Sequence, residues 1–372
     1  MTSPREALAR CRRPVVKIGS AVLANNGSLD RTRFASLCDD LARAASGRQL
    51  VVVTSGAVAL GVERLGLTER PREMALKQAA AAAGQSRLMR LYDDELETRG
   101  LRCAQILLTH ADIADRGRYL NARRAVAELL ARGVVPIVNE NDTVSVEEIK
   151  FGDNDTLAAM AVDLVEADLL VILTDAPGVY TADPRKHAGA ERLPIIERVT
   201  AAALALASGS DSAVGTGGMI TKLRAAKRAT EAGVPCAIIP GEPGALSRLL
   251  AGEDVGTLVL AQGERHALRK RWMLDLKPRG QLVVDAGARD ALRERKKSLL
   301  PSGVRSVAGE FQAGDPIEIV AEAGDAFARG LAVYGADEIR RLAGCRSSEI
   351  EARLGYRLLD CVVHRDDLVV TS

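Results

Sequence analysis

Residues 134–156 read VVPIVNENDTVSVEEIKFGDNDT, and this stretch is the most informative part of the chain. An apolar run over residues 134–138 leads directly into the sequence NEND at residues 139–142. A glycine turn then delivers GDND at residues 152–155. Asparagine offers both a donor and acceptors, whereas an ionised aspartate offers acceptors only. Two such clusters at the ends of elements suit a ligand that carries an ammonium and a carboxylate, together with a metal ion. Turns without any ligand also collect these residues, so the alternative of a plain loop stays open.

Short apolar runs alternate with helical patterns from residue 14 to about residue 260. Several runs are apolar almost throughout, which is typical of strands buried on both faces of a parallel sheet. The predicted strands cover residues 14–18, 49–53, 101–108, 134–138, 168–173 and 235–239. The predicted helices, several of them followed by the glycine expected as a C-terminal cap, cover residues 31–46, 73–99, 119–132, 155–166 and 219–232. This alternation predicts an α/β fold with helices on both faces of the sheet.

The α/β alternation stops in a charged stretch after residue 262. Short strand candidates separated by Gly, Pro and Asp follow, which is typical of a small, mostly β domain. The strand candidates are residues 281–284, 303–309, 316–320, 326–334 and 368–371, with helices expected at 288–295 and 337–344. We therefore expect an α/β domain over residues 1–265, a linker over 266–280 and a β domain over 281–372.

The composition is that of a soluble globular protein with room for two domains, since the 372 residues are 47% hydrophobic and 27% charged. A net charge of +2 is too small to imply a polyanionic partner, and 3% aromatic residues argue against a reader that stacks on single-stranded nucleic acid. The six cysteines form no Cys-x-x-Cys pair, so we expect reduced thiols and neither disulfides nor a zinc site. There is no signal peptide and no apolar run of about 18 residues, which predicts a cytoplasmic protein without a membrane segment.

A glycine-containing turn follows each of the first two predicted strands. Lys17 lies beside Gly19, where its ammonium could meet phosphate oxygens together with backbone amides. Ser55 and Gly56 follow the second strand, and the next helix N-terminus would supply donors for an anion. A surface lysine and an ordinary strand-to-helix turn would look similar, so both readings stay open here.

Two further polar groups come after the strand at residues 168–173 and before the last predicted helix of the α/β domain. Thr174 and Asp175 end that strand, and ligands of open α/β sheets bind outside the carboxyl ends of strands. The loop GTGG at residues 215–218 leads into a helix that carries Lys222, an arrangement suited to phosphate. The loop matches neither GxxxxGK[ST] nor GxGxxG, and a flexible linker is its alternative.

The combined inventory is two lysines, two glycine loops and several carboxylate–amide clusters, without an evident nucleophile or base. This combination favours phosphoryl transfer, in which catalysis consists of positioning and charge neutralisation. An acceptor carboxylate would need no base, because it is already ionised at neutral pH.

These motifs resemble the amino-acid kinase superfamily, and most closely its glutamate 5-kinase (γ-glutamyl kinase) family. The segments that carry the resemblance are VVKIGS, VVTSGAVALG, KQAAAAAGQSRL, NENDTV, GDND, LTDAPGVYTADPR and GTGGMITK, in family order over residues 14–260. The tail is similar to a PUA domain through VVDAGARDAL, KSLLPSGVRSVAGEF, GDPIEI and ARGLAVY. The resemblance implies a three-layer sandwich with a mostly parallel sheet, followed by a small PUA domain that resembles a β-barrel.

The resemblance also implies ATP-dependent phosphorylation of the γ-carboxylate of L-glutamate, the first step of proline biosynthesis. Lys17 and Lys222 would be the catalytic residues, touching the transferred phosphate and neutralising the nucleotide. Ser55, Asp142 and Asn154 would hold glutamate. The residues implied to contact ATP are Lys17, Thr174, Asp175, Thr216, Gly217, Gly218, Met219, Ile220, Thr221 and Lys222; the expected neighbours are Gly56, Asn139, Asp153 and Asp155.

Mg²⁺ would be required and held mostly by ATP oxygens, as this hard ion prefers, so no metal ligands of the protein are expected. Ile220 departs from the family, in which a small polar residue is usual, and this leaves a backbone cradle intact but removes a side-chain hydrogen bond. Feedback inhibition by proline and a homo-oligomer, either a dimer or a tetramer, are further implications of the resemblance.

Two alternatives remain. A related kinase would act on N-acetylglutamate, aspartate or a nucleoside monophosphate, but an acetylated amine would leave the charge of Asp142 unpaired, which favours glutamate. An RNA-binding PUA protein would use basic residues that otherwise form a solvated linker and helix face. These basic residues are Arg265, Arg269, Lys270, Arg271, Arg293, Arg295, Lys296 and Lys297.

Overall fold

A computed structural model describes residues 3–25, 28–69, 71–145, 153–184, 186–187, 189–207, 218–263, 273, 276–322 and 324–371. The chain divides into two compact units, and apart from the short segment 115–120 the division falls at residue 265. Each unit is described by itself below. Within the described ranges, no helix is both long enough and apolar enough to cross a membrane.

The first unit is built on an eight-stranded sheet in the order β5-β6-β4-β1-β7-β9-β10-β8. All neighbouring pairs are parallel except β9 with β10. The strands are β1 (Pro14–Ile18), β4 (Val51–Val53), β5 (Arg102–Leu108), β6 (Val134–Glu140), β7 (Leu169–Thr174), β8 (Ile195–Ile196), β9 (Cys236–Pro240) and β10 (Thr257–Val259). Every residue of β1, β4, β7 and β9 is buried, as the apolar runs predicted, because helices cover both faces of these strands. All six predicted strands are confirmed.

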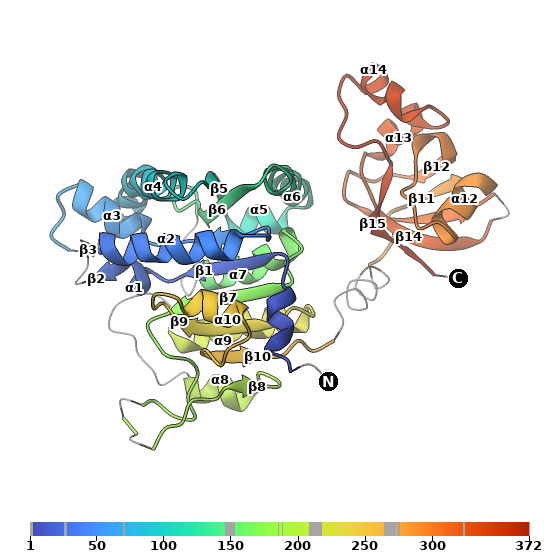
Figure 1. Cartoon of the computed structure of the whole chain (residues 1–372). Coiled ribbons are helices and arrows are strands. Elements are labelled where there is room, and N and C mark those ends of the chain that lie inside the picture. Colours follow the sequence, from blue (N-terminus) through green and yellow to red (C-terminus); the bar gives the residue numbers. More distant parts are fainter. Residues whose placement is uncertain are drawn as a thin grey trace. The chain divides into compact units, whose positions relative to one another are not determined.

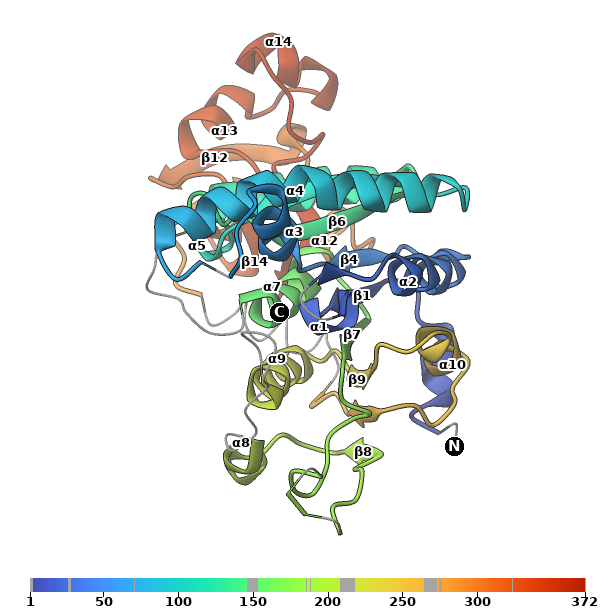
Figure 2. The ribbon, with the colours of Figure 1, turned by 90° about the vertical axis from the view of Figure 1, so that its left-hand side faces the viewer.

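Helices form the two outer layers of this unit (Figure 2). One face of the sheet shares a core with α2 (Arg31–Ala45), α4 (Met74–Glu97) and α10 (Ala245–Leu250). Helices α7 (Asp153–Leu164) and α9 (Met219–Glu231) lie on the other face. The remaining elements are η1 (Glu6–Arg10), α1 (Ser20–Leu23), β2 (Ala24–Asn25), β3 (Ser28–Leu29), α3 (Ala57–Arg64), α5 (His110–Ala114), α6 (Arg116–Ala131) and α8 (Ala201–Ala207). The predicted three-layer α/β architecture is confirmed.

Helices α3 and α4 touch through their backbones. A Cβ atom on Gly84 would lie 1.8 Å from the carbonyl oxygen of Ala57, and one on Gly61 would lie 1.7 Å from that of Ala80. Any side chain at these two positions would push the helices apart. The close approach holds the middle of α4 over the first turn of α3, near the carboxyl end of β4.

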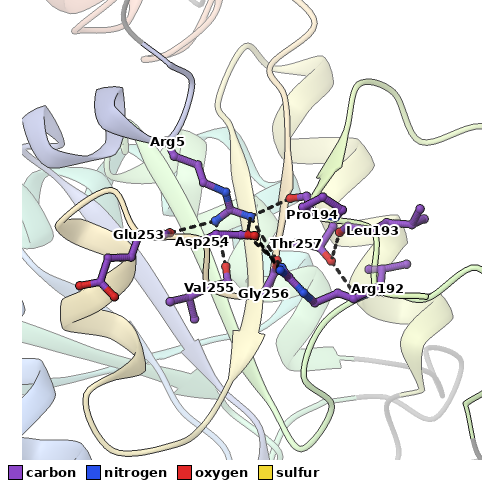
Figure 3. A network of polar contacts seen from close by, with 10 residues as sticks. Arg5, Arg192, Leu193, Pro194, Glu253, Asp254, Val255, Gly256 and Thr257 are labelled. Atoms are coloured by element: carbon purple, nitrogen blue, oxygen red, sulfur yellow. Dashed lines mark hydrogen bonds and ion pairs between the residues drawn. The ribbon is translucent and has the colours of Figure 1, made fainter. Parts of the chain in front are cut away.

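A buried arginine ties the N-terminal segment to the far edge of the sheet (Figure 3). Arg5 is 8% exposed and donates to the backbone carbonyls of Glu253, Val255, Gly256 and Pro194 at 2.7–3.2 Å. Arg5 also pairs with Asp254, which in turn accepts from both terminal nitrogens of Arg192. Charged hydrogen bonds from one guanidinium to four carbonyls fix this edge in one conformation.

The second unit contains a five-stranded sheet in the order β12-β11-β13-β14-β15 (Figure 1). Its elements are β11 (Gly280–Val284), α12 (Ala286–Arg293), η2 (Pro301–Gly303), β12 (Val304–Gly309), β13 (Pro316–Ala321), β14 (Ala326–Ala332), α13 (Ala336–Leu342), η3 (Ser347–Glu349), α14 (Ile350–Leu354) and β15 (Val363–Val370). The predicted β-rich tail is confirmed. Strand β15 starts five residues before the predicted run at 368, because an edge strand, which has β14 as its one neighbour in the described sheet, tolerates the polar sequence HRDD.

Candidate active site

The candidate residues of the first unit gather along one edge of its sheet. Lys17 is the fourth residue of β1, Ser55 follows β4 by two residues, Asn139 lies near the end of β6, and Thr174 ends β7. The order β6-β4-β1-β7 places these four strands side by side and parallel, so their carboxyl ends meet at the same edge. That edge is where open α/β sheets bind ligands.

A buried carboxylate between two lysines forms the centre of this edge. The Lys17 Nζ atom lies 2.7 Å from Asp155 Oδ1, and the Lys222 Nζ atom lies 3.5 Å from Asp155 Oδ2. Thr221 Oγ1 also donates to Asp155 Oδ2, at 2.6 Å. The side chains of Asp155 and of each lysine are 1% and 7% exposed, respectively. Asp155, which we expected only as a neighbour, is therefore the residue that joins the two predicted catalytic lysines.

The electrostatics of the cluster follow from burial and from the close charges. Burial raises the pKa of the Asp155 carboxyl, but the ammonium groups of Lys17 and Lys222 outweigh burial and hold this pKa below its ordinary value. Burial lowers the pKa of Lys222, with Lys17 adding to the effect and Asp155 opposing it. Two cations thus share one anion, and this three-residue cluster carries a net positive charge that suits phosphate groups.

Two helix N-termini deliver this cluster. Helix α7 begins at Asp153, so Asn154 and Asp155 lie in its first turn, and α9 begins at Met219, so Thr221 and Lys222 lie in its first turn. The first backbone N–H groups of a helix have no partner within the helix and favour anions. Gly218 precedes α9 in an extended conformation. The half-buried Met219 and Ile220 belong to the same turn. The predicted residues Thr216 and Gly217, and the side chain of Asp153, lie outside the described parts of the structure.

Polar amide groups line the edge on the β4 and β6 side. Asn154 Nδ2 donates to Ser55 Oγ at 3.0 Å, and Asn139 Nδ2 donates to Gln85 Oε1 at 2.8 Å. The adjoining Gly56 has a φ of +106°, a left-handed conformation that favours glycine at this turn. These contacts bring together the predicted substrate residues Ser55 and Asn154.

Asp142 and the Thr174–Asp175 pair lie farther along the same edge. Asp142 is half-buried in the turn after β6, where the Asn141 amide donates to the Leu108 carbonyl at 3.0 Å. On the opposite side, the buried Thr174 donates from its Oγ1 to Asp175 Oδ1 at 2.9 Å. The exposed Asp175 carboxylate is thus held at the carboxyl end of β7.

Sequence reasoning assigned no role to Gln85, although the helix motif KQAAAAAGQSRL contains it. The available signal was a polar residue next to Gly84 in an alanine-rich helix, but the helix packing that carries it to Asn139 involves residues 54 positions apart. The described residues contain no group of three or more His, Cys, Asp or Glu arranged to hold a metal ion.

Comparisons with known proteins agree over nearly the whole chain. Residues 12–240 match the model of the amino acid kinase family, and residues 280–354 match that of the PUA domain. A glutamate 5-kinase of Myxococcus xanthus is 54% identical over 100% of this chain and 99% of its own length. Glutamate 5-kinases of Deinococcus radiodurans (52% identical; 96% of this chain, 99% of that protein) and Pelobacter propionicus (50%; 98% and 99%) are also similar.

Proposed function

The chain belongs to the amino acid kinase family, and we propose that it acts as a glutamate 5-kinase. In this reaction the terminal phosphoryl group of ATP passes to the γ-carboxylate of L-glutamate, giving ADP and L-glutamyl 5-phosphate, the first step of proline biosynthesis. The curated relatives that match this chain over almost its full length carry that name. The observation on which the mechanism rests is the buried Lys17–Asp155–Lys222 cluster.

The chemistry requires positioning and charge neutralisation only. A γ-carboxylate oxygen attacks the terminal phosphorus atom, the bond between that phosphorus and the bridging oxygen breaks, and ADP leaves with the electron pair. No proton has to be removed, because the carboxylate is already ionised. Charge builds up on the oxygens of the transferred group, and Lys17 and Lys222 are placed to stabilise it from a preorganised, water-poor site.

The roles divide along the sheet edge. We assign Lys222 and the start of α9, with Thr174, Asp175 and the predicted loop residues Thr216 and Gly217, to the nucleotide. Lys17 belongs to β1, which lies between β4 and β7, and it faces the phosphoryl group in transfer. Ser55, Asn154 and Asp142 lie on the β4 and β6 side and hold glutamate. Asp155 is a positioning residue, because its oxygens are occupied by the two lysines and by Thr221.

Mg²⁺ fits this site as an ion carried by the nucleotide. Both Asp155 oxygens already have partners, so the described residues present no ready cage of oxygen ligands. Mg²⁺ keeps several waters and commonly binds through substrate phosphates, and here it would neutralise part of their negative charge.

A substitution of Asp142 tests which residues bind the phosphoryl acceptor, L-glutamate. We expect Asp142→Asn to raise the KM for L-glutamate by roughly 10- to 150-fold, because a charged partner of the α-ammonium group is lost. The KM for ATP should change by less than about threefold, since Asp142 lies on the other side of Lys17. Steady-state kinetics with each substrate varied in turn give both values, and a parallel rise in both would contradict the assignment.

Several further features stay predictions. We propose domain limits of 1–265, 266–280 and 281–372, inhibition by proline and a homo-oligomeric enzyme, either a dimer or a tetramer. The six cysteines are free thiols, which supports a reducing compartment and hence the cytoplasm. RNA binding through the PUA domain remains the second candidate for the tail.

The function itself is tested by trapping the product. Purified protein is incubated with MgATP, hydroxylamine and, in separate reactions, L-glutamate, N-acetyl-L-glutamate, L-aspartate or UMP, with ADP release followed for UMP. We expect a hydroxamate from L-glutamate alone, and its suppression by added proline. Turnover with another acceptor alone would agree with a kinase but would refute L-glutamate as its substrate.

A further inference from the structure

Two amide side chains lie on the side of the site that we assign to glutamate. In each of them, only one of the two polar atoms has a hydrogen-bond partner among the described residues. Asn154 uses its Nδ2 to donate to Ser55, and its Oδ1 is buried without a hydrogen-bond partner among the described residues. Gln85 uses its Oε1 to accept from Asn139, and its Nε2 is likewise buried and has no described partner. The site therefore contains one buried acceptor and one buried donor that a ligand can satisfy.

Leaving such groups unpaired is costly, which makes their chemistry informative. A buried polar atom without a partner loses the hydrogen bonds that water would give it, at a cost of roughly 1–3 kcal/mol. Nearly all buried polar groups in native proteins have a partner, and exceptions need an explanation. A free amino acid supplies both partners, because its ammonium donates to Asn154 Oδ1 and a carboxylate accepts from Gln85 Nε2.

The strand order tells which of the two glutamate carboxylates is near Gln85. Lys17, which faces the group in transfer, belongs to β1, whereas the partner of Gln85, Asn139, belongs to β6. β4 separates these two strands, so their axes lie about 10 Å apart. Ser55 follows the strand between them, and Asn154, in the first turn of α7, donates to Ser55. The reacting γ-carboxylate thus lies toward β1, and the α-carbon, with its ammonium and carboxylate, lies toward β6.

We propose that Gln85, held by Asn139, binds the α-carboxylate of the acceptor and thereby selects a free amino acid that keeps this charge. The inference deepens the proposed function and rests on it. Gln85 is fixed for this task by two contacts of α4: the hydrogen bond with Asn139 and the adjoining backbone contact of Gly84 with Ala57. A donor that is locked in place before binding loses little entropy when the ligand arrives.

The experiment replaces the hydrogen-bond donor of the enzyme, the amide of Gln85, with an acceptor. In the substrate, it replaces an acceptor, one α-carboxylate oxygen, with a donor. Gln85→Glu keeps an oxygen for Asn139 but places a carboxylate oxygen where Nε2 was. The α-amide of L-glutamate keeps the reacting γ-carboxylate but offers an N–H donor in place of one α-oxygen. Both substrates are assayed by the hydroxamate method with wild type, Gln85→Glu and Gln85→Met.

We expect wild type to prefer L-glutamate, and the ratio of the two kcat/KM values to shift toward the α-amide by at least 100-fold in Gln85→Glu. Gln85→Met should raise the KM for L-glutamate by roughly 10- to 150-fold, the effect of losing one hydrogen bond to a charged group, with an unchanged KM for ATP. Ala82→Glu is the matched control, because it adds the same charge to an exposed position of the same helix, and it should leave the ratio unchanged.

The outcomes separate the inference from the function on which it rests. Wild-type protein that fails to phosphorylate L-glutamate would refute the function. An active wild type together with a Gln85→Glu variant of unchanged substrate ratio would overturn the role of Gln85 alone, even if its overall activity were lower. If Gln85→Glu does not fold, the KM values of Gln85→Met decide the question, and equal changes for L-glutamate and ATP would count against the proposal.

Discussion

Replacing Lys222 with alanine is expected to lower kcat by roughly two to three orders of magnitude, the usual effect of removing one preorganised donor that stabilises charge in a transition state. Lys222 is 7% exposed, stands in the first turn of α9 and lies 3.5 Å from Asp155. Its ammonium is shielded from bulk water, so solvent could stabilise the charge in its place only if the site reorganised. Single-turnover measurements at saturating MgATP and L-glutamate isolate the chemical step from product release.

Two other variants show whether position and charge both matter. Lys227→Ala changes a lysine of the same helix that is 44% exposed and paired with Glu231, and it should leave kcat near the wild-type value. Lys222→Arg keeps a cation. Because the pKa of Lys222 is lowered, wild-type kcat should begin to fall with rising pH earlier than an ordinary lysine would allow. Arginine stays charged, so this alkaline limb should move to higher pH in Lys222→Arg. Near-native kcat in Lys222→Ala would exclude Lys222 from the chemistry.

The arrangement of strands and helices was predictable because local pattern and burial agree. β7 is apolar over almost its whole length and is buried over its whole length, so the run at residues 168–173 could be read directly as a central strand. The limits of β15 were harder to predict, since its middle residues are charged and its extent is set by pairing with β14. The order of the strands, which brings residues of β6 and β7 to one edge, is not encoded in any local pattern.

The candidate site was predictable to the extent that its residues follow strands or begin helices. Lys17 and Lys222 stood out because each lies next to a glycine-containing turn. The central role of Asp155 did not stand out, since NENDTV and GDND contain six other acidic or amide residues. The selection depends on which side chain of the first turn of α7 points to β1, and thus on tertiary packing. Gln85 was missed for the same reason.

Replacing Asp155 with asparagine should have the second large effect, and it should separate turnover from nucleotide binding. Asp155 is the shared anion of Lys17 and Lys222, and asparagine keeps its shape but not its charge. The two lysines then repel each other. The pKa of Lys222 falls further, because the negative charge of Asp155, which raised it, is lost. We expect kcat to drop by at least about 100-fold, as both donors lose the placement on which charge stabilisation depends.

Stability and ATP binding should move in opposite directions in this variant. Removing one partner of a buried ion pair costs roughly 3–5 kcal/mol, which lowers the midpoint of thermal unfolding by roughly 10 °C in a domain of this size. Nucleotide phosphates can replace the lost anion between the lysines, so the ATP-induced rise in this midpoint should be larger than in wild type.

Asp40→Asn is the matched control for these measurements. Asp40 is another buried carboxylate, 2% exposed, and it accepts from Arg43, from the backbone N–H of Gly244 and from Ser247, none of which belongs to the lysine cluster. Its replacement should lower the unfolding midpoint but leave kcat and the ATP-induced shift unchanged, because it touches neither lysine. An Asp155→Asn enzyme that loses ATP binding in proportion to kcat, or behaves like Asp40→Asn, would show that the carboxylate supports the fold without positioning the lysines. A lowered kcat with a larger ATP-induced shift would instead mean that the carboxylate holds the two ammonium groups in place, against their mutual repulsion, until the phosphates arrive.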